Sequence, residues 1–199
     1  EAQLLPNAGL GLKMIVDHLP DLKIIASGSS SFDLSTKVGE PLTGRHRILT
    51  LYPLAMLELK QQWGGMTIHQ KLDEFLIYGC FPETLKQTNQ NDKIEYLTTL
   101  RDSYLLKDLL TLETIKNSSK LFDLLKLVAF QIGQPVAVNE LSNQLGMGKH
   151  TVIRYLDLLE KVFIIKRVQG FSRNLRKEIT KTARYYFLDN GIRNAIISN

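Results

Sequence analysis

The sequence predicts an α/β segment over residues 1–52, followed by a mostly α-helical remainder. Three observations predict this class. In the first 52 residues a helical apolar pattern is followed by short continuous apolar runs. Helical spacing then continues through most of the chain, and two β-type runs lie near its end. With 44% apolar and 23% charged residues among 199, the composition is globular and excludes a disordered or collagen-like protein.

Several classes of protein are excluded by simple features of the sequence. No apolar run approaches the roughly 18 residues that a membrane span requires. Cys80 is the single cysteine, which excludes a disulfide scaffold and fits a reducing compartment. The opening residues have neither the basic nor the apolar region of a signal peptide. We therefore expect a cytoplasmic protein, and the first residue, Glu1, suggests a piece of a longer chain.

The positive charge is concentrated near the end of the chain. The formal net charge is +5, but the residues from Lys161 onward carry nine Lys or Arg against two acidic residues. The first 160 residues are therefore slightly acidic as a group. A basic segment on a nearly neutral body indicates a polyanionic partner.

Residues 1–52 read as part of a parallel α/β sheet. Leu12, Ile15, Val16 and Leu19 recur at helical spacing, and Pro20 should end that helix. Two short apolar runs, 23–26 and 48–51, follow as expected buried strands. Because two strands do not make a stable sheet, we expect the remaining strands to lie outside this sequence.

Residues 53–117 read as a helical connector. Pro53 suits a first helical position, and Thr67–Gln70 has the pattern of a capping box. The polar stretch Gln87–Asp92 is the best linker in the chain, and a long helix should begin at Asp92.

Residues 118–199 carry the clearest local pattern, which is that of a winged helix-turn-helix. We expect a helix from Ser118 to about Ile132, a short helix from Glu140 to Leu145 capped by Asn139, and a third after the turn Met147-Gly148. Two β-type runs, 163–168 and 185–188, should form the hairpin. This order of elements defines the winged helix arrangement.

The basic residues of this region point to double-stranded DNA. The first turn of the third helix supplies Lys149, His150 and Thr151, with Arg154 one turn later. The predicted wing adds three further cations, Arg173, Arg176 and Lys177. Cations suit phosphates, and a planar Arg suits a guanine edge in the major groove. The alternative is that the module packs against another protein and the basic residues are only solvated.

The loop after the first expected strand is a weaker candidate. In KIIASGSSS, the hydroxyls of Ser27, Ser29 or Ser30 would lie at the carboxyl end of a strand, where a phosphate or water could bind. The alternative is an ordinary turn. The four histidines are far apart and there is no cysteine cluster, so no metal site is predicted. A GxxxxGK[ST] phosphate loop is absent from the sequence.

Taken together, six segments resemble one family along nearly the whole chain. They are, in order, EAQLLPNAGLGLK, KIIASGSSS, LTGRHRILTLYPLAMLEL, FLIYGCFPE, YLLKDLL and YYFLDNGIRNA. The chain is similar to the prokaryotic AAA+ superfamily ATPases that carry a C-terminal winged-helix domain of uncharacterised function. The resemblance implies that residues 1–52 are an α/β remnant of a P-loop ATPase core.

The resemblance also implies roles for residues of the first segment. Glu1 would be the carboxylate that orients the attacking water, and Ser27 with Ser29 would be the sensor loop near the γ-phosphate. Arg45 would be the arginine finger or sensor that stabilises charge on the transferring phosphoryl group. The alternative for Arg45 is a structural ion pair with Glu40 or Glu58. The resemblance further implies ATP and Mg²⁺ as cofactors of the parent protein and self-association through its ATPase core.

The sequence departs from the family pattern in lacking the phosphate loop and the Asp of the Walker B strand. It also ends soon after Asp189, where relatives continue. We therefore expect this chain alone neither to bind nor to hydrolyse ATP, and expect no cofactor in it, whereas the parent would do both. We interpret the sequence as part of an ATP-binding protein that couples ATP hydrolysis to a partner-binding winged helix. The alternatives are a DNA-binding transcriptional regulator and a protein-contact module.

Overall fold

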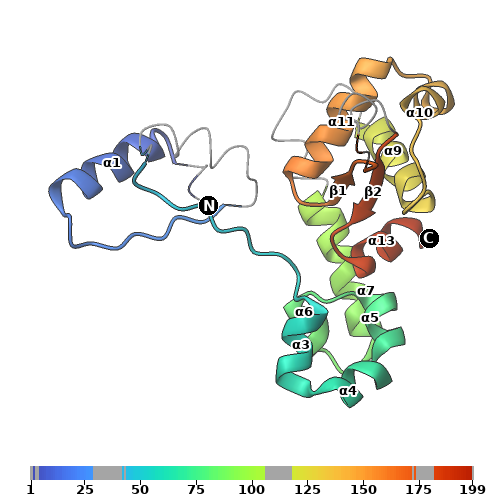
Figure 1. The fold of residues 1–199 in the computed structure, drawn as a ribbon, viewed down its shortest axis with the longest axis horizontal. Helices are drawn as coiled ribbons and strands as arrows, with labels where there is room; N and C mark the ends of the chain where they lie inside the picture. The colour runs from blue at the N-terminus through green and yellow to red at the C-terminus, as the bar shows by residue number, and fades with distance from the viewer. Residues whose placement is uncertain are drawn as a thin grey trace. The chain divides into compact units, whose positions relative to one another are not determined.

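The computed structural model describes residues 2, 5–28, 42, 44–105, 118–171, 173 and 182–198. Contacts within the chain divide it into two units, Glu1–Leu51 and Tyr52–Asn199, drawn in Figure 1. Each unit is treated by itself below.

The first unit contains helix α1, Ala8–His18, which confirms the helix predicted from its apolar spacing. It starts after Asn7, whose φ of 55° is left-handed, and the N–H of Leu19 bonds the Ile15 carbonyl at its end. Ala8 and Leu42 are buried, with Leu12 and Val16 packed against them. This is a small cluster, so α1 is held by few apolar contacts.

The two strands predicted in this unit are wrong. Residues 22–28 and 46–51 form no β-strand, and the side chains of Ile25, Leu49 and Leu51 are 96%, 86% and 96% exposed. A β-strand needs a neighbour for its backbone groups and a layer over its apolar face. The described part of this unit supplies neither, so these apolar runs stay uncovered and the expected α/β layer is not formed there.

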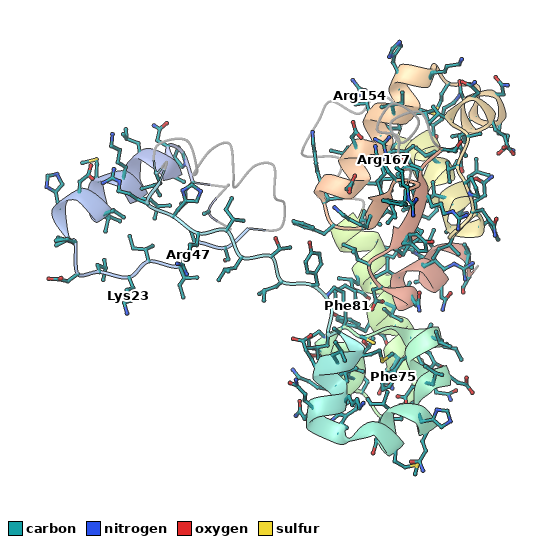
Figure 2. The ribbon with its side chains drawn as sticks, in the orientation of Figure 1. Lys23, Arg47, Phe75, Phe81, Arg154 and Arg167 are labelled. Carbon is teal, nitrogen blue, oxygen red and sulfur yellow. The ribbon has the colours of Figure 1, made fainter. Side chains whose placement is uncertain are left out.

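The second unit begins with short helices, which confirms the helical character predicted for its first part. Their bounds are α3 Met56–Trp63, α4 Gly65–Gln70, α5 Leu72–Tyr78, α6 Pro82–Lys86 and α7 Gln90–Thr99, with a π-helical continuation Leu100–Leu105. Trp63 stacks on the buried Phe75 with ring centroids 6.2 Å apart, and Phe75 is labelled in Figure 2. This aromatic contact joins α3 to α5.

Several predicted helix starts in this part are displaced. Pro53 lies before α3, which begins at Met56, and Glu58 accepts a hydrogen bond from the N–H of Ala55 at 2.8 Å. Thr67 is inside α4 and is not a cap, because the turn at Gly64, with φ 79°, starts that helix earlier. Helix α7 is capped by Asn89, three residues before the predicted start at Asp92.

The rest of the second unit holds three helices, a hairpin and a final helix. Their bounds are α9 Ser118–Phe130, α10 Val138–Leu145, α11 Lys149–Lys161, β1 Ile165–Val168, β2 Arg184–Phe187 and α13 Asn190–Ile197. The strands pair antiparallel, with Ile165 opposite Phe187 and Val168 opposite Arg184. The predicted helices and hairpin are thus present in the predicted order, although α10 starts at Val138 and Ala137, not Asn139, is its N-cap.

One apolar core joins these elements. Its fully buried residues come from every helix of the group and from the hairpin, and include Leu124, Val128, Leu141, Val152, Leu159, Ile165 and Ile196. Helix α13, which the sequence did not predict, packs against α5, α7 and α9 (Figure 1). It therefore connects the first helices of the unit with the last group.

Among the described helices, none has the length and apolar character needed to cross a membrane.

Candidate functional site

Arg45, the predicted arginine finger, is engaged by an acidic residue of its own unit. Its Nη1 lies 2.5 Å from Oδ1 of Asp17 on α1, and both side chains are more than a third exposed. The hydrogen bond from Arg45 lowers the pKa of the Asp17 carboxyl. The sequence offered Glu40 or Glu58 as an ion-pair partner of Arg45. The observed partner is Asp17, and Glu58 instead accepts a hydrogen bond from the N–H of Ala55. Glu40 lies outside the described residues.

Ser27 lies beside the start of the chain. Its carbonyl accepts a hydrogen bond from the N–H of Ala2 at 2.8 Å, so two segments assigned to the nucleotide site are adjacent. Glu1 and Ser29 lie outside the described residues. Among the described residues of this unit, the contact of Arg45 is the ion pair with Asp17. We derive no catalytic step through ATP for this chain.

The turn before α11 is fixed by side chains from two helices. Nζ of Lys120 on α9 donates to the carbonyls of Leu145, at 2.6 Å, and Gly146, at 3.2 Å. Ser142 donates to the carbonyl of Met147 at 2.5 Å. Gly146 has φ 57°, the left-handed conformation that ends α10. The turn that leads into α11 is therefore held by three side-chain hydrogen bonds.

The outer side of α11 carries the predicted cations. Lys149, His150 and Arg154 are exposed and Thr151 is half-buried, whereas Val152, Tyr155, Leu156 and Leu159 face the core. The guanidinium of Arg154 lies 5.6 Å from the centre of the Tyr155 ring. The helix thus has one apolar face in the core and one exposed face that carries the cations of its first turns.

The hairpin extends the basic surface. Arg173 is exposed, whereas Arg176 and Lys177 lie outside the described residues. The sequence reasoning did not single out two exposed cations on the strands, Arg167 on β1 and Arg184 on β2; Figure 2 labels Arg154 and Arg167. The polar and aromatic alternation of β2, Arg-Tyr-Tyr-Phe, was a signal for Arg184, because buried Tyr185 and Phe187 leave the other two outward.

Acidic residues limit this positive surface. Glu160 on α11 binds Lys166, with the two charged atoms 3.0 Å apart, and also accepts from the N–H of Arg167. Exposed Asp157 lies one turn after Arg154. The first half of α11 is therefore the most positive part of the helix.

Among the described residues no group of three His, Cys, Asp or Glu side chains is placed to hold a metal ion.

Comparison with known proteins separates the chain into two regions. Residues 1–60 match a family described as an AAA domain, so an AAA-like ATPase region stands at the start. Residues 69–199 match the family described as Domain of unknown function (DUF8612). No solved structure matches the chain.

Two curated relatives are uncharacterized proteins. One, from Haemophilus influenzae, is 28% identical over 179 residues, which are 85% of this chain and 44% of that protein. The other, from Methanocaldococcus jannaschii, is 23% identical over 178 residues, 81% of this chain and 39% of that protein. The chain spans less than half the length of either relative. Since the match over residues 69–199 covers more than half of the chain, the chain belongs to the family described as Domain of unknown function (DUF8612), and an AAA-like region precedes that domain.

Proposed function

We propose that the chain is part of an ATP-binding AAA-like ATPase in which nucleotide binding and hydrolysis are coupled to a partner held by a winged helix. The observation that carries the proposal is the AAA match over residues 1–60, followed by the helices α10 and α11 with a short turn between them and exposed cations at the start of α11. ATP and Mg²⁺ are cofactors of the longer protein in this proposal. Arg45 would act on the transferring phosphoryl group there, and Ser27 would lie near the phosphates.

The proposed partner is double-stranded DNA. Lys149, His150, Thr151 and Arg154 lie on the first turns of the helix that follows a fixed turn, which is the part that meets base edges in this motif. Arg167, Arg173 and Arg184 would contact phosphates from the hairpin. The rival is a protein-contact module, which the 43% exposure of Ile153 on the same face favours.

Salt dependence separates the two partners. Duplex binding should be measured by fluorescence anisotropy from 50 to about 300 mM salt with the wild type, Lys149→Ala, Arg154→Ala and Lys86→Ala. Lys86 is an exposed cation on α6, outside the helix-turn-helix, and serves as the matched control. We expect the first two variants each to reduce the salt slope by about 1, whereas Lys86→Ala leaves it unchanged. Weak binding that is equally affected by all three changes would contradict the DNA proposal.

The proposed ATPase activity is tested on a longer protein that contains this sequence. There, Arg45→Ala should lower kcat by about 10³-fold or more, as loss of an arginine finger does. Arg47→Ala is the matched control, because Arg47 is an exposed arginine two residues after Arg45 and is labelled in Figure 2. Equal losses in the two variants would contradict the role of Arg45. Turnover by the 199-residue chain itself, abolished by Arg45→Ala, would contradict the expectation that this chain is inactive alone.

A further inference from the structure

Cys80 joins three segments that are far apart in the sequence. The N–H of Leu54 donates to the Cys80 carbonyl at 3.0 Å, and the N–H of Cys80 donates to Oδ2 of Asp189 at 2.7 Å. Leu54 is near the start of the second unit, three residues after Leu51, and Asp189 directly precedes α13. Two hydrogen bonds in series therefore run from the beginning of this unit to its last helix.

Asp189 uses its two carboxylate oxygens for different purposes. Oδ1 accepts from the N–H of Ile192 at 3.1 Å and caps α13, while Oδ2 accepts from Cys80. The residue is 6% exposed, and no ion pair with it occurs among the described side chains. Loss of either hydrogen bond would leave a buried carboxylate oxygen without a partner to replace the water that it loses on folding, which costs free energy. The cap of α13 and the bond to Cys80 are thus made by one rigid group.

Two glycines make this contact close. Gly79 has φ 75°, and a Cβ built there would overlap the Asp189 carboxylate; a Cβ on Gly191 would overlap the Tyr78 carbonyl. Asn194 on α13 adds hydrogen bonds from Nδ2 to the carbonyls of Leu76 and Ile77, at 3.0 and 2.8 Å. These carbonyls belong to the last turn of α5, which has no helical donor for them. Helix α13 is therefore seated on the end of α5 with no room between them.

Both ends of this series of contacts reach the group formed by α9, α10, α11 and the hairpin β1–β2. The Tyr52 ring meets the Phe163 ring edge to face, with centroids 6.2 Å apart, at the corner between α11 and β1. Phe163 has φ 59°, a conformation rare for a bulky residue. At the other end, Nε of Arg193 on α13 donates to the Ala129 carbonyl of α9 at 3.1 Å. The segment 52–55 and α13 thus each contact the group that carries the basic helix.

We propose that Leu54, Cys80 and Asp189 form a conformational relay, in which the position of segment 52–55 and the seating of α13 on α5 and α9 are thermodynamically linked. Displacing Leu54 shifts the Cys80 peptide and weakens the hydrogen bond from Cys80 to Asp189. Because such coupling is reciprocal, loosening α13 in turn weakens the hydrogen bond from Leu54 to Cys80. Use of the relay to report nucleotide state to the winged helix rests on the proposed function. The linkage itself requires neither nucleotide nor DNA.

Hydrogen exchange of the 199-residue chain, followed by mass spectrometry without nucleotide, tests the relay. Leu54→Pro removes the N–H that starts it, and Leu54→Ala is the matched control that removes the side chain but keeps the N–H. We expect the amides of the peptide that contains Ile192 to exchange about tenfold faster in Leu54→Pro than in Leu54→Ala. A tenfold change in rate corresponds to the net free energy of about one hydrogen bond. An equal rate in the two variants would overturn the relay.

The reverse direction provides a second test on a different residue. Asp189→Asn keeps one carbonyl oxygen to cap α13, since Asn is a good N-cap, but has no second acceptor for Cys80. We expect exchange at Leu54 to rise by about tenfold, while amides of α10 and the core side of α11 change less than about twofold. An equal rise throughout α9, α10 and α11 would mean global destabilisation and would overturn the relay. Because no ligand is added, these results stand whether or not the ATPase or DNA experiments succeed.

Discussion

Nζ of Lys120 on α9 donates a hydrogen bond to the backbone carbonyl of Leu145 at 2.6 Å and thereby closes the C-terminus of α10. The last carbonyls of a helix lack intrahelical partners and carry partial negative charge, so a cation is favoured there. The second bond from the same ammonium, to Gly146, holds the turn that leads into α11. One side chain of α9 therefore satisfies backbone carbonyls at the end of α10 and in the turn after it.

Replacing Lys120 should destabilise the group of helices α9, α10 and α11. Lys120→Met keeps most of the apolar stem but loses both hydrogen bonds, so we expect the free energy of unfolding to fall by about 1.5–3 kcal/mol. Urea denaturation measures this. Lys126→Met on the same helix is the control, because its ammonium lies 5.0 Å from the centre of the Phe122 ring and should cost about 1 kcal/mol or less. Losses of the same size in the two variants would contradict the capping role.

The helices could be predicted because their signals are local. The apolar faces of α9 and α11 follow the helical period, and Gly146 and Gly148 bracket the turn between α10 and α11. The same reasoning placed Lys149, His150 and Arg154 on an exposed helix face. Such features depend on residues three or four positions apart, which a sequence displays directly.

The contacts that join distant segments could not be predicted. Asp189 in Asp-Asn-Gly reads as an ordinary turn, and only the fold shows that its carboxylate reaches Cys80, 109 residues earlier. The apolar runs at 23–26 and 48–51 have strand-like sequences, but pairing depends on neighbours that the described part of their unit lacks. Arg45 likewise forms an ion pair with Asp17, a partner that the spacing of residues in the sequence did not indicate.

The ion pair of buried Lys93 with half-buried Glu74 should respond unequally to loss of either partner. Lys93 is 4% exposed, whereas Glu74 is about a third exposed and also lies 3.4 Å from Lys71. Glu74→Gln therefore leaves a buried ammonium above the Tyr78 ring and should cost about 3 kcal/mol, whereas Lys93→Met should cost about 1 kcal/mol. Urea denaturation at neutral pH compares them, and the opposite order would contradict this account.

The same pair should affect stability in acid. The hydrogen bond from Lys93 lowers the pKa of Glu74 below its usual value of 4.5. Its stabilisation is therefore present above pH 4.5 and is lost as the pH falls through the lowered pKa. The Lys93→Met variant should lose less stability than the wild type over this range, which denaturation at pH 3 to about 6 will show. Parallel curves for the two proteins would mean that Lys93 does not set the Glu74 pKa.

Cys80 should react slowly with thiol reagents while the chain is folded. Burial, and secondly the charge of Asp189, raise the pKa of its thiol from 9.0 to about 11. At pH 8 the thiolate fraction is then about 100-fold smaller than in the unfolded chain, so labelling should slow by at least about that factor. The chain has one cysteine, so a colorimetric thiol assay in buffer and in urea reports on Cys80 alone. Equal rates in the two solutions would contradict its burial.

Asp189 should make the folded chain less stable as the pH rises above about 4. Burial raises the pKa of its carboxyl above 3.8, although hydrogen bonds from the N–H groups of Cys80, Ile192 and Gly191 oppose this. Between 3.8 and the raised pKa the unfolded chain ionises first, so stability from this group is lost as the pH increases through that window. Asp189→Asn cannot ionise, and subtracting its unfolding free energy from that of the wild type at each pH cancels the titration of Glu74 and the other carboxyl groups. We expect the difference, wild type minus variant, to decrease as the pH rises and then to level off once Asp189 is ionised in the folded chain. A difference that increases instead would mean that the three N–H groups outweigh burial and that the folded site favours the carboxylate.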